Sequence, residues 1–159
     1  MKVTVVVVGR VRGPLASAVA DYEARARRYW KLEVIEVDAG ARAAKAGGED
    51  VRSAEEERIV ARLPSGSEVL ALTRSGEPMT SADLARRLGE GALHGSPGAT
   101  FVVGGAFGLG EGILERAAHR ISLSSLTFPH ELARLVLAEQ LYRAGTILRN
   151  EPYHKGTSE

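Results

Sequence analysis

Few residues in this chain belong to types that commonly carry out chemistry. Among 159 residues there is no cysteine, and the four histidines are His94, His119, His130 and His154. The lack of cysteine excludes disulfides, thiolate metal sites and a cysteine nucleophile. No two histidines stand four residues apart, as the zinc motif HExxH requires, so we expect no metal site. The absence of a GxSxG motif also disfavours a serine hydrolase.

The glycine-rich segment GGAFGLG spans residues 104–110 and follows an apolar run. Such a segment between a strand and a helix resembles a nucleotide-binding loop. Its spacing is not GxGxxG, and the acid about twenty residues later, Glu131, falls inside a predicted helix, so the dinucleotide fingerprint fails. No Gly-Lys-Ser/Thr triplet occurs, which excludes a Walker loop. The segment therefore favours either contact with another ligand or an ordinary strand-to-helix turn.

The segment SLSSLTFPHELAR, residues 122–134, places hydroxyl groups next to apolar side chains. Backbone groups of such a loop could hydrogen-bond the edge of an adenine, with Leu123, Leu126 and Phe128 enclosing the ring. The alternative is a capped helix start, in which His130 is only a polar residue near the cap. The pattern of residues allows both interpretations.

Basic residues gather between positions 10 and 31, where six of them stand against two acidic residues. The six are Arg10, Arg12, Arg25, Arg27, Arg28 and Lys31, and Tyr29 and Trp30 lie beside them. Arginine with aromatic rings can bind phosphate and stack on exposed bases. A solvated helix face is the alternative. The net charge of the whole chain is only +1, so any nucleic-acid surface must be local.

The end of the chain reads NEPYHK over residues 150–155, with Arg143 and Arg149 before it. Chain ends usually fray, and a frayed end is one interpretation here. A Tyr-His pair beside a proline is more than solubility requires, so a functional tail is the other interpretation.

The elements that must position these residues follow from the spacing of apolar residues. We expect strands over residues 2–8, 32–37, 68–73, 99–103 and 120–123, and helices over residues 14–29, 49–63, 81–88, 111–118 and 129–148. We expect a turn over residues 74–79, loops over 39–48 and 91–98, a helix cap at Ser81 and a polar tail over 150–159. Strands that alternate with helices predict one α/β domain with a mostly parallel sheet flanked by helices. Ligands of such sheets bind beyond the carboxyl ends of the strands, here after Thr73, Val103 and Leu123.

The composition of the chain is that of a globular protein, with 44% hydrophobic and 26% charged residues. The length predicts one domain. No apolar run approaches the roughly 18 residues of a membrane span, and the run at residues 3–8 is too short for a signal peptide. We therefore expect a cytoplasmic protein without a membrane partner.

Three motifs together resemble a known family. The strand and loop VVGGAFGL at residues 102–109, the segment LSSLTFPHELARLVLAEQLYRA at 123–144 and the tail NEPYHK at 150–155 are similar to ribosomal RNA large-subunit methyltransferases of the RlmH type. The N-terminal VVVVGRVR and the helix with DYEARARRY fit the same family. The resemblance covers residues 1–155. The motifs are specific for this family only when they are taken together.

The resemblance implies a SPOUT methyltransferase, a single domain over residues 1–159 with a deep trefoil knot in its C-terminal part. The knot and cofactor site would lie within about residues 70–155. It further implies a homodimer that transfers a methyl group from S-adenosylmethionine to N3 of a pseudouridine in 23S ribosomal RNA. The implied substrate is the assembled 70S ribosome, with no metal required.

The family's functional residues carry over to matching positions. For the cofactor they are Leu72, Gly104, Gly105, Leu123, Ser124, Ser125, Leu126, Thr127 and Phe128. For catalysis they are His154 and, as second choice, His130 as the base, Arg143 for charge developing on the target base, and Tyr153 for stacking. Given the implied dimer, the basic residues Arg25, Arg27 and Arg28, with Lys155 of the tail, become candidates for RNA contact.

The chain departs from the family pattern at residues 39–48 and 156–159, outside the motifs. Three alternatives to the ribosomal substrate stay open: a SPOUT enzyme that acts on transfer RNA, a non-catalytic ribosome-binding factor, and a generic nucleotide-binding α/β enzyme. The failed fingerprints disfavour the last. The small size, with no appended RNA-binding domain, and the NEPYHK tail favour the ribosome.

Overall fold

Five strands form one parallel sheet in the computed structural model, which describes residues 1–39 and 47–155. The strands are β1 (Lys2–Val8), β2 (Lys31–Val37), β3 (Glu68–Pro78), β4 (Ala99–Val103) and β5 (His119–Ser122). Their order in the sheet is β2-β1-β4-β3-β5, and every neighbouring pair is parallel. This confirms the predicted sheet. The loop predicted over residues 39–48 and the tail over 150–159 lie partly outside the described residues.

The valine run of β1 is buried on both faces of the sheet. Val3, Val5 and Val7 belong to one apolar cluster, and Val6 and Val8 belong to the other. Side chains alternate between the two faces of a strand, so a continuous apolar run suits a strand with helices on both sides. β1 accordingly lies inside the sheet, between β2 and β4.

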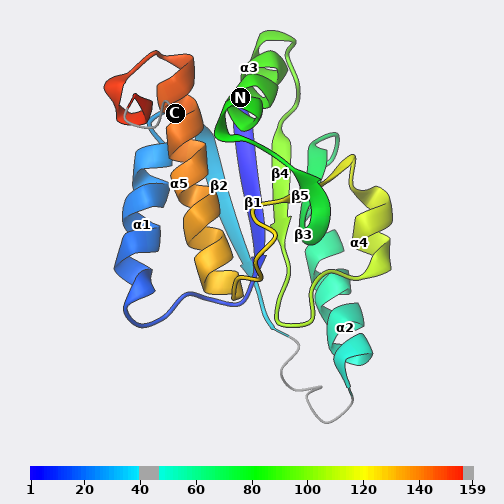
Figure 1. The fold of residues 1–159 in the computed structure, drawn as a ribbon. Helices are drawn as coiled ribbons and strands as arrows, with labels where there is room; N and C mark the ends of the chain where they lie inside the picture. The colour runs from blue at the N-terminus through cyan, green and yellow to red at the C-terminus, as the bar shows by residue number, and fades with distance from the viewer. Residues whose placement is uncertain (40–46, 156–159) are drawn as a thin grey trace.

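The helices are α1 (Leu15–Ala26), α2 (Gly48–Val60), α3 (Ser81–Leu93), α4 (Glu111–Arg116) and α5 (His130–Leu148). A 3₁₀ helix follows at Pro152–His154. α1, α3 and α5 cover one face of the sheet, and α2 and α4 cover the other (Figure 1). α5 lies between α1 and α3 and contacts both. The fold is therefore a three-layer α/β/α arrangement, as the alternating pattern predicts.

The turn predicted over residues 74–79 is wrong, because β3 continues to Pro78. An irregularity between Leu72 and Glu77 lets both of these residues pair with Ile121 of β5. At Gly76 the chain passes so close to β5 that a Cβ atom would lie 2.6 Å from the carbonyl carbon of Ile121. Gly and Pro here accompany an irregular strand rather than a turn. Such a crossing is consistent with a knot, which stays a prediction.

The start and the end of α3 also differ from the prediction. Thr80, and not Ser81, caps the helix. The Thr80 hydroxyl accepts a hydrogen bond from the backbone N–H of Asp83 at 3.1 Å, and the Asp83 carboxylate accepts one from the backbone N–H of Thr80 at 3.2 Å. Ser81 instead donates to the Gln140 side chain of α5 at 2.5 Å. The helix continues beyond Leu88, because Gly89 permits close packing on Leu148, whose Cδ2 would be 2.8 Å from an added Cβ. Tertiary packing overrides the low helix propensity of glycine.

Candidate functional site

A cleft of about 220 Å³ opens at the carboxyl ends of β4 and β5, beside the irregular part of β3 that follows Leu72. It is lined by Leu72, Thr73, Arg74, Val103, Gly104, Gly105, Ala106, Gly108, Leu109, Leu123, Ser124, Leu126, Thr127, Phe128, His130 and Ala133. Three segments far apart in the sequence supply these residues. They meet because parallel strands all end at the same edge of the sheet. Of the predicted cofactor residues only Ser125, which is exposed, does not line the cleft.

The glycine loop folds tightly at the floor of the cleft. The N–H of Gly108 donates to the carbonyl of Gly105 at 3.1 Å, and Gly108 has a φ of +76°, which favours glycine. A Cβ on Gly105 would lie 2.9 Å from the buried carboxylate of Glu55 on α2. The next residue of α2, Glu56, accepts from the backbone N–H of Ile113 at 3.3 Å. α2 therefore supports the loop from below and leaves no room for side chains there.

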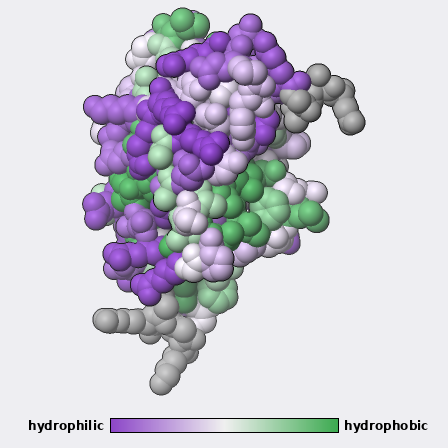
Figure 2. Space-filling model, turned by 90° about the vertical axis from the view of Figure 1, so that its left-hand side faces the viewer, coloured by the Kyte–Doolittle hydropathy of each residue, from purple (hydrophilic) through white to green (hydrophobic). Residues whose placement is uncertain are grey.

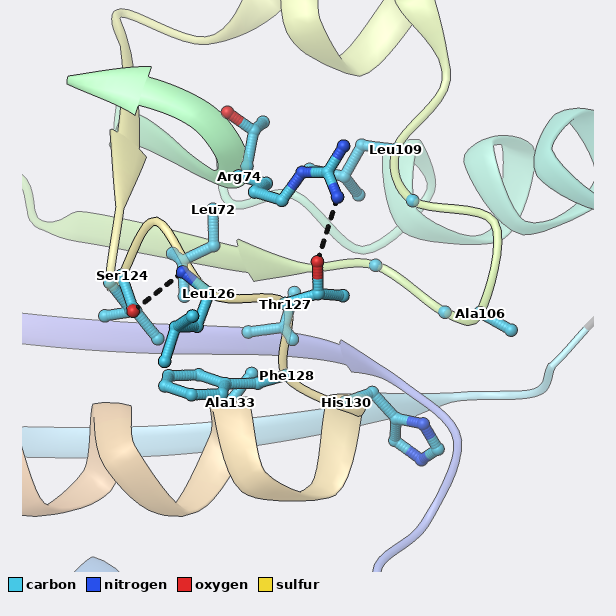
Figure 3. Close-up of a pocket in the computed structure, with 16 residues that line it drawn as sticks. Leu72, Arg74, Ala106, Leu109, Ser124, Leu126, Thr127, Phe128, His130 and Ala133 are labelled. Carbon is cyan, nitrogen blue, oxygen red and sulfur yellow. Dashed lines mark hydrogen bonds between the residues drawn. The ribbon is translucent and has the colours of Figure 1, made fainter. Parts of the chain in front are cut away.

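The loop before α5 forms the opposite wall (Figure 3). The Ser122 hydroxyl donates to the carbonyl of Ser124 at 2.8 Å, and the Ser124 hydroxyl accepts from the N–H of Leu126 at 3.0 Å. These bonds hold the backbone in a fixed shape. Leu126 is 71% exposed, an unusual state for a large apolar side chain at the lip of a cleft. A flat apolar ligand would cover it.

Two polar residues of the cleft, Thr73 and Arg74, were not among the predicted cofactor residues, although a ligand was expected after Thr73. The Thr73 hydroxyl is buried and has no hydrogen-bond partner within residues 1–39 and 47–155. Buried polar atoms are rarely left without a partner, so this hydroxyl points to a ligand. Arg74 Nη1 donates to the Thr127 hydroxyl at 3.0 Å, which links β3 to the loop before α5 (Figure 3). The expected ligand position after Thr73 was the available signal, but no residue type at 73–74 was assigned to the cofactor.

His130 is the only one of the four predicted catalytic residues that lines the cleft. Its ring packs on Gly9 at the end of β1, where a Cβ would lie 3.2 Å from the ring Nε2. Gly9 also has a φ of +82°, so glycine suits this position on two counts. The same Nε2 lies 3.8 Å from a carboxylate oxygen of Glu131. His130 therefore stands at the edge of the cleft with its ring against the end of β1.

The other three predicted catalytic residues lie at the far end of α5. His130 begins this helix and Arg143 lies in its later half, so the helical rise separates them by ~20 Å. Tyr153 and His154 belong to the 3₁₀ helix that follows. Within one chain the structure therefore does not bring Arg143, Tyr153 and His154 to the cleft.

The tail packs on α5 rather than fraying. The Tyr153 hydroxyl donates to Glu139 at 3.0 Å, and Arg143 forms an ion pair with the same carboxylate oxygen at 2.6 Å. The Arg143 guanidinium also lies 4.9 Å from the centre of the Tyr153 ring. Burial, together with hydrogen bonds to Tyr22 and Glu139, raises the pKa of Tyr153 above its usual value. The tail thus forms, with α5, an ordered surface of aromatic and cationic groups.

The predicted RNA-contact residues lie at the same end of the molecule as the tail. Arg27 and Arg28, just after α1, are exposed, and so is Lys155. Arg25 forms an ion pair with Asp21 at 2.9 Å, and its guanidinium carbon lies 5.2 Å from the centre of the Tyr22 ring. In the view toward α1, hydrophilic residues gather over the upper part of the face (Figure 2). The structure therefore groups the predicted RNA residues with the tail and away from the cleft.

Over residues 1–39 and 47–155, no group of three or more histidine, aspartate or glutamate residues could hold a metal ion. No helix in the same part of the chain is long and apolar enough to cross a membrane.

Comparisons with known proteins point to one family. A family model described as a predicted SPOUT methyltransferase matches residues 1–154. The ribosomal RNA large subunit methyltransferase H of Gemmatimonas aurantiaca is 50% identical over 156 residues, which cover 98% of this chain and 100% of that protein. The protein of the same name from Pelotomaculum thermopropionicum is 46% identical, over 96% of this chain and 98% of that protein.

A solved structure, titled as a probable methylase family protein from Haemophilus influenzae Rd KW20, has a similar fold. Its TM-score is 0.54 at 11% identity, and the match covers 96% of this chain and 70% of that chain. At this identity the likeness concerns the fold alone. The family match and the curated relatives confirm the resemblance inferred from the motifs.

Proposed function

Because this chain belongs to the SPOUT methyltransferase family, we propose that it methylates N3 of a pseudouridine in 23S ribosomal RNA of the assembled ribosome, with S-adenosylmethionine as the methyl donor. One observation carries the proposal: residues from three separate segments, matched to the family's cofactor positions, line a single cleft at the carboxyl edge of the sheet. Such a substrate would also make this a cytoplasmic protein.

The cleft suits the proposed cofactor. Leu72 and Leu126 offer apolar surfaces for an adenine, and the backbone of residues 123–128 can hydrogen-bond its polar edge. The buried Thr73 hydroxyl is available to a further polar group. Gly104 and Gly105 let a ligand approach the backbone closely. S-adenosylmethionine, when bound, supplies an electrophilic methyl group on a positively charged sulfur atom.

The residues of this chain then have to hold the target base in line with that methyl group and remove its proton. Positioning accounts for much of the rate of such displacements. N3 of pseudouridine carries a proton, which a neutral histidine could accept. We assign this role to His154 first and to His130 second. Arg143 stabilises negative charge on the base carbonyl groups, and Tyr153 stacks on the flipped base.

We further propose that the active form is a homodimer. Arg143, Tyr153 and His154 stand about one helix length from the cleft of their own chain. A second copy that packs against α1 and α5 could bring its tail to this cleft. The exposed Arg27, Arg28 and Lys155 would then lie beside the cofactor of the partner and contact the RNA backbone.

The first experiment incubates the protein with radiolabelled S-adenosylmethionine and ribosomes from a strain that lacks the endogenous methyltransferase. Intact ribosomes, free large subunits and transfer RNA are compared. We expect label only in intact ribosomes, mapped to a pseudouridine of the large-subunit RNA. Label in transfer RNA would show that transfer RNA, and not the ribosome, is the substrate. Binding to ribosomes without any transfer would support a non-catalytic ribosome-binding factor.

A second experiment tests the RNA surface. Charge reversal in the double variant Arg27→Glu/Arg28→Glu should weaken ribosome binding and flatten its salt dependence, because phosphate contacts release counterions. Affinity for the cofactor should not change. Arg62→Glu, an equally exposed position after α2, serves as the matched control. Methylation that survives the double reversal intact would remove Arg27 and Arg28 from the interface.

A further inference from the structure

Among the described residues that line the cleft, Arg74 alone has a permanent positive charge, and none is an aspartate or glutamate. No described carboxylate forms an ion pair with Arg74. Other arginines of the described residues do have an acidic neighbour: Arg134 bonds Glu23 at 2.8 Å and Arg143 bonds Glu139 at 2.6 Å. The cleft therefore holds a cation without a counter-charge, and this favours a ligand with an anionic group.

The position of the guanidinium is set from two sides. Arg74 follows directly after Leu72 and Thr73 on β3, and both of those residues also line the cleft. Its Nη1 donates to the hydroxyl of Thr127 at 3.0 Å, across the mouth of the cleft (Figure 3). A single bond from Nη1 leaves the other N–H groups of the planar guanidinium available, and a carboxylate can accept two of them in parallel.

We propose that Arg74 binds the α-carboxylate of the methionine part of the methyl donor and is thereby a specificity-determining residue of the cofactor site. The inference rests on the proposed function. S-adenosylmethionine carries a single anionic group, this carboxylate, and its product S-adenosylhomocysteine retains it. Arg74 thus recognises the amino-acid end of the cofactor, whereas Leu72 and Leu126 contact the adenine end.

The test measures binding rather than turnover. Isothermal titration calorimetry compares S-adenosylhomocysteine with its decarboxylated analogue, which differs only in the missing carboxylate. For the unmodified protein we expect the carboxylate to improve the affinity about tenfold, in the range of a charge-assisted hydrogen bond. In Arg74→Met the affinity for S-adenosylhomocysteine should fall about tenfold, while that for the analogue stays unchanged. Arg74→Lys should keep part of the preference.

Two matched variants separate charge recognition from scaffolding. Thr127→Val removes the bond that helps to position Arg74 and leaves its charge, so part of the preference for the carboxylate should persist even where both affinities fall. Arg62→Met, remote from the cleft and exposed, should behave like the unmodified protein. Equal weakening of both ligands in Arg74→Met would show that Arg74 only holds the loop, and no weakening would also overturn the proposal.

An RNA phosphate is the other source of an anionic oxygen. If Arg74→Met left both calorimetric affinities unchanged but raised the KM for ribosomes, the partner would be the phosphate, and our assignment would be wrong. If the unmodified protein bound neither S-adenosylhomocysteine nor the donor, the proposed function itself would fail. The two failures are therefore distinguishable.

Discussion

Gly76 is a position where a single methyl group has no space. A Cβ there would lie 2.6 Å from the carbonyl carbon of Ile121 and 2.7 Å from that of Arg120, and backbone atoms cannot rotate away as a flexible side chain can. The glycine thus permits the crossing of β3 and β5 on which Leu72, Thr73 and Arg74 depend for their position. The residue does no chemistry, yet it helps to shape the cleft.

We predict that Gly76→Ala lowers the free energy of unfolding by about 1–3 kcal/mol, the usual cost of overpacking. Urea denaturation can be followed by the fluorescence of the single tryptophan, the buried Trp30. Gly91→Ala is the control, since its Cβ would meet the flexible Sδ of Met1 at 3.0 Å and alanine favours a helix. Equal stability of Gly76→Ala and the unmodified protein would contradict the proposed crossing.

Tyr29 gives a second prediction at this scale. Burial, followed by its hydrogen bond to Glu151, raises the pKa of Tyr29 to about 12, against the usual value near 10. The folded state therefore favours the neutral phenol. Its contribution to stability is complete below pH ~10 and is lost as the pH rises through the folded value. An absorbance titration of the unmodified protein should show a phenol that ionises near pH 12, and this ionisation should be missing in Tyr29→Phe.

Glu151→Gln should lower the pKa of Tyr29, because it removes the negative charge that opposes ionisation. An unchanged pKa of Tyr29 in this variant would show that Tyr29 is not hydrogen-bonded to Glu151. Since Glu151 begins the tail, the titration also reports whether the tail is docked.

At the scale of elements, a buried ion pair joins α1 to α5. Arg134 donates to Glu23 at 2.8 Å, and only 9% and 10% of their side-chain surfaces are exposed. Arg134 also lies 3.7 Å from Glu36 at the end of β2. α5 carries His130 at its start and the tail after its end, so this pair fixes the element that positions both parts of the predicted catalytic set.

We predict that Arg134→Leu lowers the free energy of unfolding by about 3–5 kcal/mol, because it leaves the buried Glu23 carboxylate with only the more distant Arg27, 4.0 Å away. The double variant Glu23→Leu/Arg134→Leu should recover much of this loss, because an apolar pair needs no charge compensation. Thermal or urea unfolding measures both effects, with the exposed Arg28→Leu as control. A double variant no more stable than the single one would argue against this account.

At the scale of the whole molecule, the predicted site divides between two ends of α5. The cofactor cleft lies at one end, with His130, and the tail with Tyr153 and His154 lies at the other. A homodimer would resolve this separation if each tail served the cleft of its partner. The proposal makes activity a property of the pair rather than of either chain.

Mixed dimers test this arrangement. Gly105→Val should disable one cleft by displacing its glycine loop, since the added Cβ would lie 2.9 Å from the Glu55 carboxylate of α2. The double variant Tyr153→Ala/His154→Ala should disable one tail. Each variant alone should be inactive on ribosomes. Together they should regain about a quarter of the activity, because half of randomly paired dimers are mixed and each has one complete site. No recovery after co-expression would contradict a shared site.

The sequence by itself determined the parallel α/β architecture and most of the cleft. The valine run of β1 and the short apolar run of β4 are local patterns, and parallel strands must end at one edge of their sheet. The positions of Gly104, Gly105 and the loop before α5 at one site follow from that geometry. The family motifs predicted the same residues, and the cleft contains all of them but Ser125.

Only the tertiary structure decided where the remaining groups stand. Gly and Pro in residues 74–79 predicted a turn, but pairing with β5 extends β3 through this segment. That pairing placed Thr73 and Arg74 in the cleft, opposite a loop some fifty residues later in the chain. Packing of the tail on Glu139 likewise placed Tyr153 away from His130. The physical reason is that local patterns specify elements, whereas contacts between distant segments depend on how those elements pack.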